Sequence, residues 1–158
     1  IRLKKQKNGV IALSTDVTAE RDFARIMPIE RLGVYVTRVA FENQQRVMLP
    51  WRHLQDKSSI ARFATEIDQI KRAFRFEFTA STQVLSPAFS MFSPKPTQCE
   101  RKVIDISGDG RANQGESTGQ MTSLMADFGA MINGLVILED HPNPLEFYVN
   151  DIKRGPLS

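Results

Sequence analysis

An apolar segment that runs directly into an acidic, glycine-containing loop constrains the fold of this chain most strongly. Residues 103–106 are typical of a short buried strand, and Ser107-Gly-Asp-Gly110 follows at once. The glycines give this loop conformational freedom. In open α/β sheets, ligands and ions bind outside the carboxyl ends of the strands. The segment therefore predicts a strand end that presents a hydroxyl and a carboxylate, those of Ser107 and Asp109, at a binding edge.

The rest of the chain alternates between strand-like and helix-like patterns. Runs of β-branched and aromatic residues indicate strands, and apolar residues spaced three and four apart indicate amphipathic helices. This order predicts a three-layer α/β fold, with a mostly parallel, twisted sheet of five or six strands, helices on both faces and one antiparallel edge hairpin. Strands are expected at 9–13, 33–41, 45–49, 102–107 and 131–138, with 73–80 as a sixth, and helices at 19–27, 60–70, 82–92, 121–128 and 145–152.

Polar residues and one glycine mark the ends of these helices. Residues 56–59 supply three candidate caps, Ser117 or Thr118 is expected to cap the next-to-last helix, and Gly129 to close it. The hairpin is expected to end at Pro50-Trp51. The apolar face of the next-to-last helix is expected to consist of Met121, Leu124, Met125 and Phe128, and that of the last helix of Leu145, Tyr148, Val149 and Ile152.

Size and charge limit the classes of function. The chain has 158 residues, which favours a single domain over residues 1–158. The net charge is +3, and the only basic cluster lies at residues 2–7, so the basic stripe of a nucleic-acid-binding protein is not present. No apolar run approaches the roughly 18 residues of a membrane span, and no signal peptide is visible. The single cysteine, Cys99, excludes an intrachain disulfide.

Five stretches between residues 45 and 156 form a recognisable pattern. They are Arg46-Val-Met-Leu-Pro-Trp51, Ser81-Thr82, the segment 101–115, the segment 132–140, and Phe147-Tyr148 ahead of Gly155-Pro156. On this pattern, the larger part of the chain resembles a bacterial von Willebrand factor A-like family of unassigned function. The resemblance implies a three-layer α/β domain that binds a protein partner and carries out no catalysis.

The first part of the chain has a different likeness. Residues 8–23 and 33–43 are similar to the start of the aspartate/glutamate racemase and maleate isomerase superfamily, in its ectoine-utilisation branch. Two interpretations follow. The chain is a splice of two α/β proteins with a junction near residues 43–46, or it is one diverged von Willebrand A-like domain.

The von Willebrand resemblance implies a metal-ion-dependent adhesion site. In such a site an Asp and hydroxyls follow the first strand, a Thr comes from a mid-chain loop, and a second Asp follows a later strand. Asp16 and Thr18 match the first group, Thr82 the second and Asp109 the third. Oxygen ligands of this kind suit Mg²⁺ or Mn²⁺. A partner protein would then complete the site with an acidic side chain.

Other interpretations of the same residues stay open. Glu20 replaces the final serine of the first motif, and Ser81 replaces the glycine that usually precedes Thr82. Asp109 is also suited to bonding turn amides beside its glycines, and Thr18 and Thr82 to capping helices. A scaffold without a metal, or without any evolved activity, therefore remains an alternative to the metal site.

The racemase likeness implies a third function, a carboxylate-handling isomerase. Ser14, Thr15 and Thr18 would receive a substrate carboxylate through their hydroxyls and a helix N-terminus. Ser107 is a separate candidate for ligand binding. Only Cys99 and two histidines have the chemistry of a base or nucleophile, and no motif joins them. A protein-binding module is therefore favoured over an enzyme.

The von Willebrand resemblance also bears on location, since it implies an exported or periplasmic protein.

Overall fold

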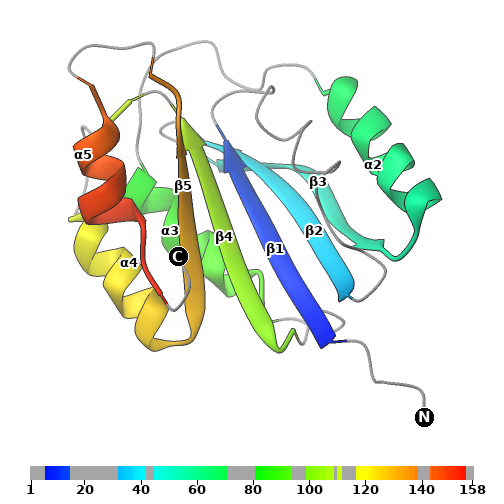
Figure 1. Ribbon diagram of the computed structural model, residues 1–158, viewed down its shortest axis with the longest axis horizontal. Helices are drawn as coiled ribbons and strands as arrows, with labels where there is room; N and C mark the ends of the chain where they lie inside the picture. The colour runs from blue at the N-terminus through cyan, green and yellow to red at the C-terminus, as the bar shows by residue number, and fades with distance from the viewer. Residues whose placement is uncertain are drawn as a thin grey trace.

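Five strands form one open sheet in the order β3-β2-β1-β4-β5 (Figure 1). The computed structural model describes residues 6–14, 32–41, 45–70, 81–93, 99–108, 110–111, 117–138 and 143–155. The sheet is parallel except for one pair, because β3 runs antiparallel to β2. The predicted class is therefore confirmed, including its antiparallel edge hairpin. The strands are β1 (Gln6–Ser14), β2 (Leu32–Phe41), β3 (Gln45–Leu54), β4 (Arg101–Gly108) and β5 (Ala130–Val136).

The edge hairpin is longer than the sequence indicates. We expected it to end at Pro50-Trp51, but β3 continues to Leu54, and the prediction was wrong at this point. The pairing of β3 with β2 shifts register on both sides of Arg38, which marks bulges in the ladder. Because β3 lies at the edge of the sheet, a proline without an N–H is tolerated there. Pro50 therefore interrupts the ladder without ending the strand.

The described helices are α2 (Lys57–Asp68), α3 (Ser81–Ser90), α4 (Thr118–Asp127) and a last helix made of α5 (Leu145–Phe147) and the π-helix η1 (Tyr148–Ile152). A reciprocal cap opens α2: Asp56 Oδ1 accepts from the Ser59 N–H at 2.7 Å, and Ser59 Oγ accepts from the Asp56 N–H at 3.1 Å. Ser117 caps α4, and Gly129, with φ of 80°, follows it. The expected helix at 19–27 and strand at 73–80 lie outside the described residues.

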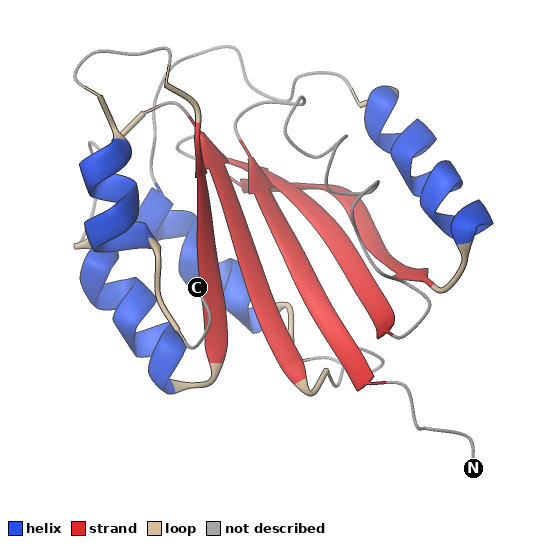
Figure 2. Ribbon diagram, in the orientation of Figure 1, coloured by secondary structure: helices blue, strands red, loops and turns tan. Residues whose placement is uncertain are grey.

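Two separate cores cover the two faces of the sheet, because neighbouring residues of each central strand point to opposite sides. Val10, Val103 and Met131 pack with Phe63 and Ile67 of α2. The next residue along each strand joins the larger core, which contains side chains of α3, α4 and η1. Figures 1 and 2 show the same arrangement, with α2 apart from the other helices. The members of the larger core on the strands are Ile11, Ile104, Ile106, Ala130 and Ile132.

Two predicted helix faces were only partly right. Met125, Tyr148 and Ile152 are buried as expected. However, Leu124 and Phe128 are 51% and 63% exposed, although we assigned them to the buried face of α4. Leu145 and Val149 of the last helix are also largely exposed. The buried positions of α4 are instead mainly small or polar, namely Thr118, Gly119, Thr122 and Met125.

A glycine in β5 lets the last helix lie directly on the sheet. A Cβ atom added to Gly134 would come within 2.6 Å of Tyr148 Cδ1. The chain after η1 then returns to the sheet, where the N–H and C=O of Ile132 exchange hydrogen bonds with Arg154. The close approach at Gly134 and this bridge together fix the last helix against β5.

Candidate functional site

The sheet brings two candidate loops to neighbouring points on its carboxyl edge. β1 and β4 are adjacent and parallel, and their register pairs Ser14 with Ser107 at the last step. The loop that begins at residue 15 and the loop that begins after Gly108 therefore leave the sheet side by side. The register therefore establishes that these two strands end at neighbouring positions, while the arrangement of the predicted ligands stays a prediction.

Ser107 is the one predicted site residue whose side chain the structure describes. It is 7% exposed, and strand alternation puts it on the same face of the sheet as Val103. Within the described residues its hydroxyl has no hydrogen-bond partner. Ser107 therefore brings a buried hydroxyl to the carboxyl end of β4.

The other predicted site residues are described only in part. Asp16, Thr18, Asp109 and Thr15 lie outside the described residues. Ser14 belongs to β1 and Thr82 to the first turn of α3, and only their main chain is described. The gathering of Asp16, Thr18, Thr82 and Asp109 around one ion therefore stays a prediction.

The direction of α3 indicates on which side of the sheet its first turn lies. Phe92, just beyond the end of α3, lies close to Gly9 near the start of β1: a Cβ atom added to Gly9 would be 3.0 Å from its ring. The end of the helix therefore lies toward the amino edge of the sheet. Its first turn, which contains Thr82, lies at the opposite end of the helix.

The loop after β4 is held at two points, on either side of Asp109 in the sequence. The Ile137 N–H donates to the Gly108 carbonyl at 2.9 Å. Arg111 Nη2 donates to the Asn143 carbonyl at 2.8 Å. Asn143 Oδ1 in turn accepts from the Leu145 N–H at 2.8 Å, at the start of α5. Sequence reasoning missed Arg111, because its partner lies 32 residues away and no motif announces the contact.

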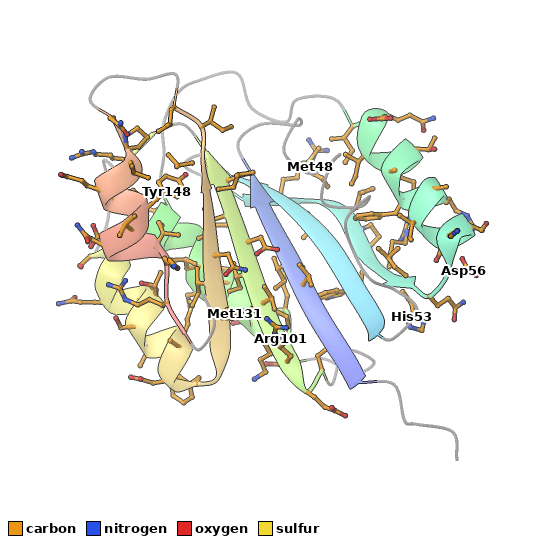
Figure 3. The ribbon with its side chains drawn as sticks, viewed as in Figure 1. Met48, His53, Asp56, Arg101, Met131 and Tyr148 are labelled. Carbon is orange, nitrogen blue, oxygen red and sulfur yellow. The ribbon has the colours of Figure 1, made fainter. Side chains whose placement is uncertain are left out.

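A carboxylate also lies within the sheet, below this edge. Asn133 Nδ2 of β5 donates to Asp105 Oδ1 of β4 at 2.7 Å. Burial raises the pKa of Asp105, while the bond from Asn133 and the charge of Arg101 act in the opposite direction. Figure 3 shows Arg101 beside Met131, whose sulfur accepts from Arg101 Nη2 at 3.4 Å. Sequence reasoning missed this pair, although the acidic residue inside an otherwise apolar strand is a signal that could have found it.

The isomerase interpretation gains no support from the position of Cys99. A Cβ atom added to Gly9 would lie 2.8 Å from Cys99 Sγ, so the thiol lies near the start of β1. Ser14 is the last residue of the same strand. At about 3.3 Å per residue, five residues separate the two by roughly 16 Å. The thiol is therefore remote from the edge at which Ser14 would receive a carboxylate.

The residue types predicted for the carboxyl edge are those that bind a hard cation. The residues predicted for this site would offer hydroxyl and carboxylate oxygens, which Mg²⁺ and Mn²⁺ prefer over nitrogen or sulfur. The buried hydroxyl of Ser107 and the parallel ends of β1 and β4 fit such an ion. Among the described residues, no three His, Cys, Asp or Glu side chains form a metal cluster. Nor, within that part of the chain, is any helix both long and apolar enough to cross a bilayer.

Comparison with known families assigns the whole chain to one group. A family model described as a protein of unknown function, DUF1194, matches residues 3–158. The chain belongs to this family. The match runs through residues 43–46 without a break, so the comparisons do not support a splice or a racemase origin for the first part of this DUF1194 chain. No curated protein matches the chain.

Solved structures similar to this DUF1194 chain have a von Willebrand A-like fold. BatB from Bacteroides thetaiotaomicron has a TM-score of 0.62 at 20% identity, and the alignment covers 93% of this chain and 75% of BatB. An aerotolerance-related membrane protein from Bacteroides fragilis has a TM-score of 0.61 at 18% identity, and the alignment covers 93% of this chain and 76% of that protein. Proximal thread matrix protein 1 from the mussel byssus, whose metal-ion-dependent adhesion site (MIDAS) motif is occupied by zinc, has a TM-score of 0.63 at 16% identity. The alignment covers 94% of this chain but only 39% of the mussel protein. At these identities the likeness establishes the fold alone.

Proposed function

We propose that this chain is a von Willebrand A-like binding module that holds a divalent cation at the carboxyl edge of its sheet. Asp16, Thr18, Thr82 and Asp109 would hold the ion through oxygen atoms. Ser14, Thr15 and Ser107 would surround it with further hydroxyls. The bound ion would supply a positive centre with an open coordination position, and the chain itself would carry out no catalysis.

The observation that carries this proposal is the pairing of β1 with β4. Their last paired residues, Ser14 and Ser107, stand opposite each other, so the loops with Asp16 and Asp109 start from adjacent strand ends. Parallel strands that end together present their loops on the same side of a sheet. The zinc-occupied motif of the mussel protein, whose fold is similar, supports a divalent ion at a site of this kind.

We further propose that the partner is a protein that offers an acidic side chain to the ion. A carboxylate is a hard oxygen ligand and would complete the coordination of Mg²⁺ or Mn²⁺. The likeness to a membrane protein of Bacteroides fragilis favours an exported or periplasmic location for the module.

Thermal unfolding with and without a divalent ion tests the metal site. A ligand that binds only the native state raises the free energy of unfolding, by about 1.4 kcal/mol at ten times its dissociation constant. For a chain of this size each kcal/mol raises the Tm by about 2–4 °C. We expect Mn²⁺ or Mg²⁺ at millimolar concentration to stabilise the wild-type protein, and Asp109→Ala to remove this shift.

The matched control is Asp127→Ala. Asp127 is exposed and ends α4, at the turn that leads into the start of β5, so this variant loses the same charge far from the carboxyl edge. It should keep the full metal-induced shift. A wild-type protein whose Tm does not respond to either ion, or an Asp109→Ala variant that responds as the wild type does, would contradict the proposal.

A further inference from the structure

We propose that Arg111 is a positioning residue of the candidate metal site, because it ties the loop that carries Asp109 to the start of the last helix. The inference rests on the proposed function, and it names a residue outside the expected set of metal ligands. Its basis is the pair of anchors on either side of Asp109, namely the main chain of Gly108 and the side chain of Arg111.

The first anchor belongs to the sheet. The Gly108 carbonyl accepts from the Ile137 N–H at 2.9 Å, just after the last residue that β4 and β5 pair in register. This bond continues the ladder between the two strands by one step. It fixes the start of the loop without any side chain, so substitution at position 111 leaves it intact.

The second anchor depends on one side chain. Arg111 is exposed, and its Nη2 reaches the Asn143 carbonyl across 32 residues of sequence at 2.8 Å. The acceptor is itself held in place, because Asn143 Oδ1 bonds the Leu145 N–H and the next residue, Pro144, is buried. The Tyr148 N–H donates to the Pro144 carbonyl at 3.1 Å, which joins this segment to the last helix. Arg111 therefore ties the loop to a segment that packs on the core.

A tether of this kind strengthens ion binding because it reduces the conformational entropy that the loop loses when the ion binds. A loop that is already held in place loses less conformational freedom when an ion orders it. The charge of Arg111 acts in the opposite direction, since a cation near the ion repels it. Positioning and simple electrostatics therefore predict opposite effects when Arg111 is replaced by alanine.

The test compares Arg111→Ala and Arg111→Lys with the wild-type chain by calorimetric titration with Mn²⁺. A typical net contribution of one hydrogen bond, about 1 kcal/mol, corresponds to about five-fold in affinity. We expect Arg111→Ala to bind Mn²⁺ about five-fold more weakly. Arg111→Lys keeps both a donor and the charge, and should recover most of the affinity. Tighter binding by Arg111→Ala would show that charge alone acts, and would overturn the proposal.

Hydrogen exchange of the metal-free protein gives a readout that does not depend on the ion. Amides between residues 107 and 117 should exchange faster in Arg111→Ala and at the wild-type rate in Arg111→Lys. Arg62→Ala, which removes an exposed arginine from α2, is the matched control and should change neither measurement. Unchanged exchange and unchanged affinity in Arg111→Ala would overturn the proposal. If the wild-type protein binds no Mn²⁺, the proposed metal site itself is wrong. The exchange rates would then still decide whether Arg111 holds the loop in place.

Discussion

Asp105 lies between two isoleucines of β4 and occupies a different environment from theirs. Its neighbours along β4, Ile104 and Ile106, are almost fully buried on the other face of the sheet. Asp105 itself bonds Asn133, and burial raises its pKa above the ordinary value for an aspartate. The folded state therefore binds the proton of this carboxyl more tightly than the unfolded chain does.

The raised pKa of Asp105 gives a directional prediction for stability. The contribution of this group is fully present at pH values below its ordinary pKa of 3.8, and it is lost as the pH rises through the higher folded value. Asp105→Asn cannot ionise, so we expect its free energy of unfolding not to fall in this way as the pH rises. Urea unfolding between pH 3 and pH 7 would measure it: the free energy of the variant should rise relative to the wild type as the pH rises. Parallel pH profiles for Asp105→Asn and the wild type would argue against a raised pKa.

At the scale of elements, α4 shows what a helical period can and cannot predict. The period located the helix and its cap, and it identified Met125 as buried. It missed the polar side of the buried face, because Thr122 satisfies its hydroxyl internally, donating to the Asp151 carbonyl at 2.7 Å. A buried polar side chain costs little once it is hydrogen-bonded. Hydropathy alone therefore assigned Leu124 to the buried face of α4 and left out Thr122.

Two neighbouring residues of α4 test this corrected face. Met125 is 3% exposed and belongs to the larger core, whereas Leu124 is 51% exposed. We expect Met125→Ala to lower the free energy of unfolding by about 2–5 kcal/mol, because it leaves a cavity. Leu124→Gln should change it by less than about 0.5 kcal/mol. Denaturant unfolding of both variants would measure the difference, and equal losses would mean that the face is assigned incorrectly.

At the scale of the whole molecule, β1 connects the two parts of the chain that have different sequence likenesses, those before and after residues 43–46. It pairs with β2 on one side and β4 on the other. Trp51 of β3 lies 5.8 Å from Phe92, between ring centroids, so the single tryptophan reports on the contact between the edge hairpin and α3. We expect one cooperative transition, in which tryptophan fluorescence and far-ultraviolet circular dichroism coincide. Two separated midpoints would indicate that the segments before and after residue 45 unfold independently.

The sequence was sufficient for the fold class because each strand carries its own local pattern. Residues 33–41 and 103–106 are rich in β-branched residues, and strand–helix alternation then favours a parallel sheet. The site was harder to predict, because its residues come from loops whose relative positions depend on strand pairing. Ser14 and Ser107 meet only through the register of β1 with β4, and Arg111 meets Asn143 only after the last helix has packed. No local pattern contains these long-range contacts.

The dipeptide Asn133-Gly134 is ordinarily among the strongest short-range signals for a chain reversal, yet here it lies in the middle of a straight strand. Each residue has a separate reason to be there: Asn133 bonds the carboxylate of the neighbouring strand, and Gly134 leaves room for the ring of Tyr148. Replacing this glycine would push the Tyr148 ring away from β5 and loosen the packing of the last helix on the sheet. A familiar turn signature can thus arise from two independent neighbours, one beside the strand and one above it.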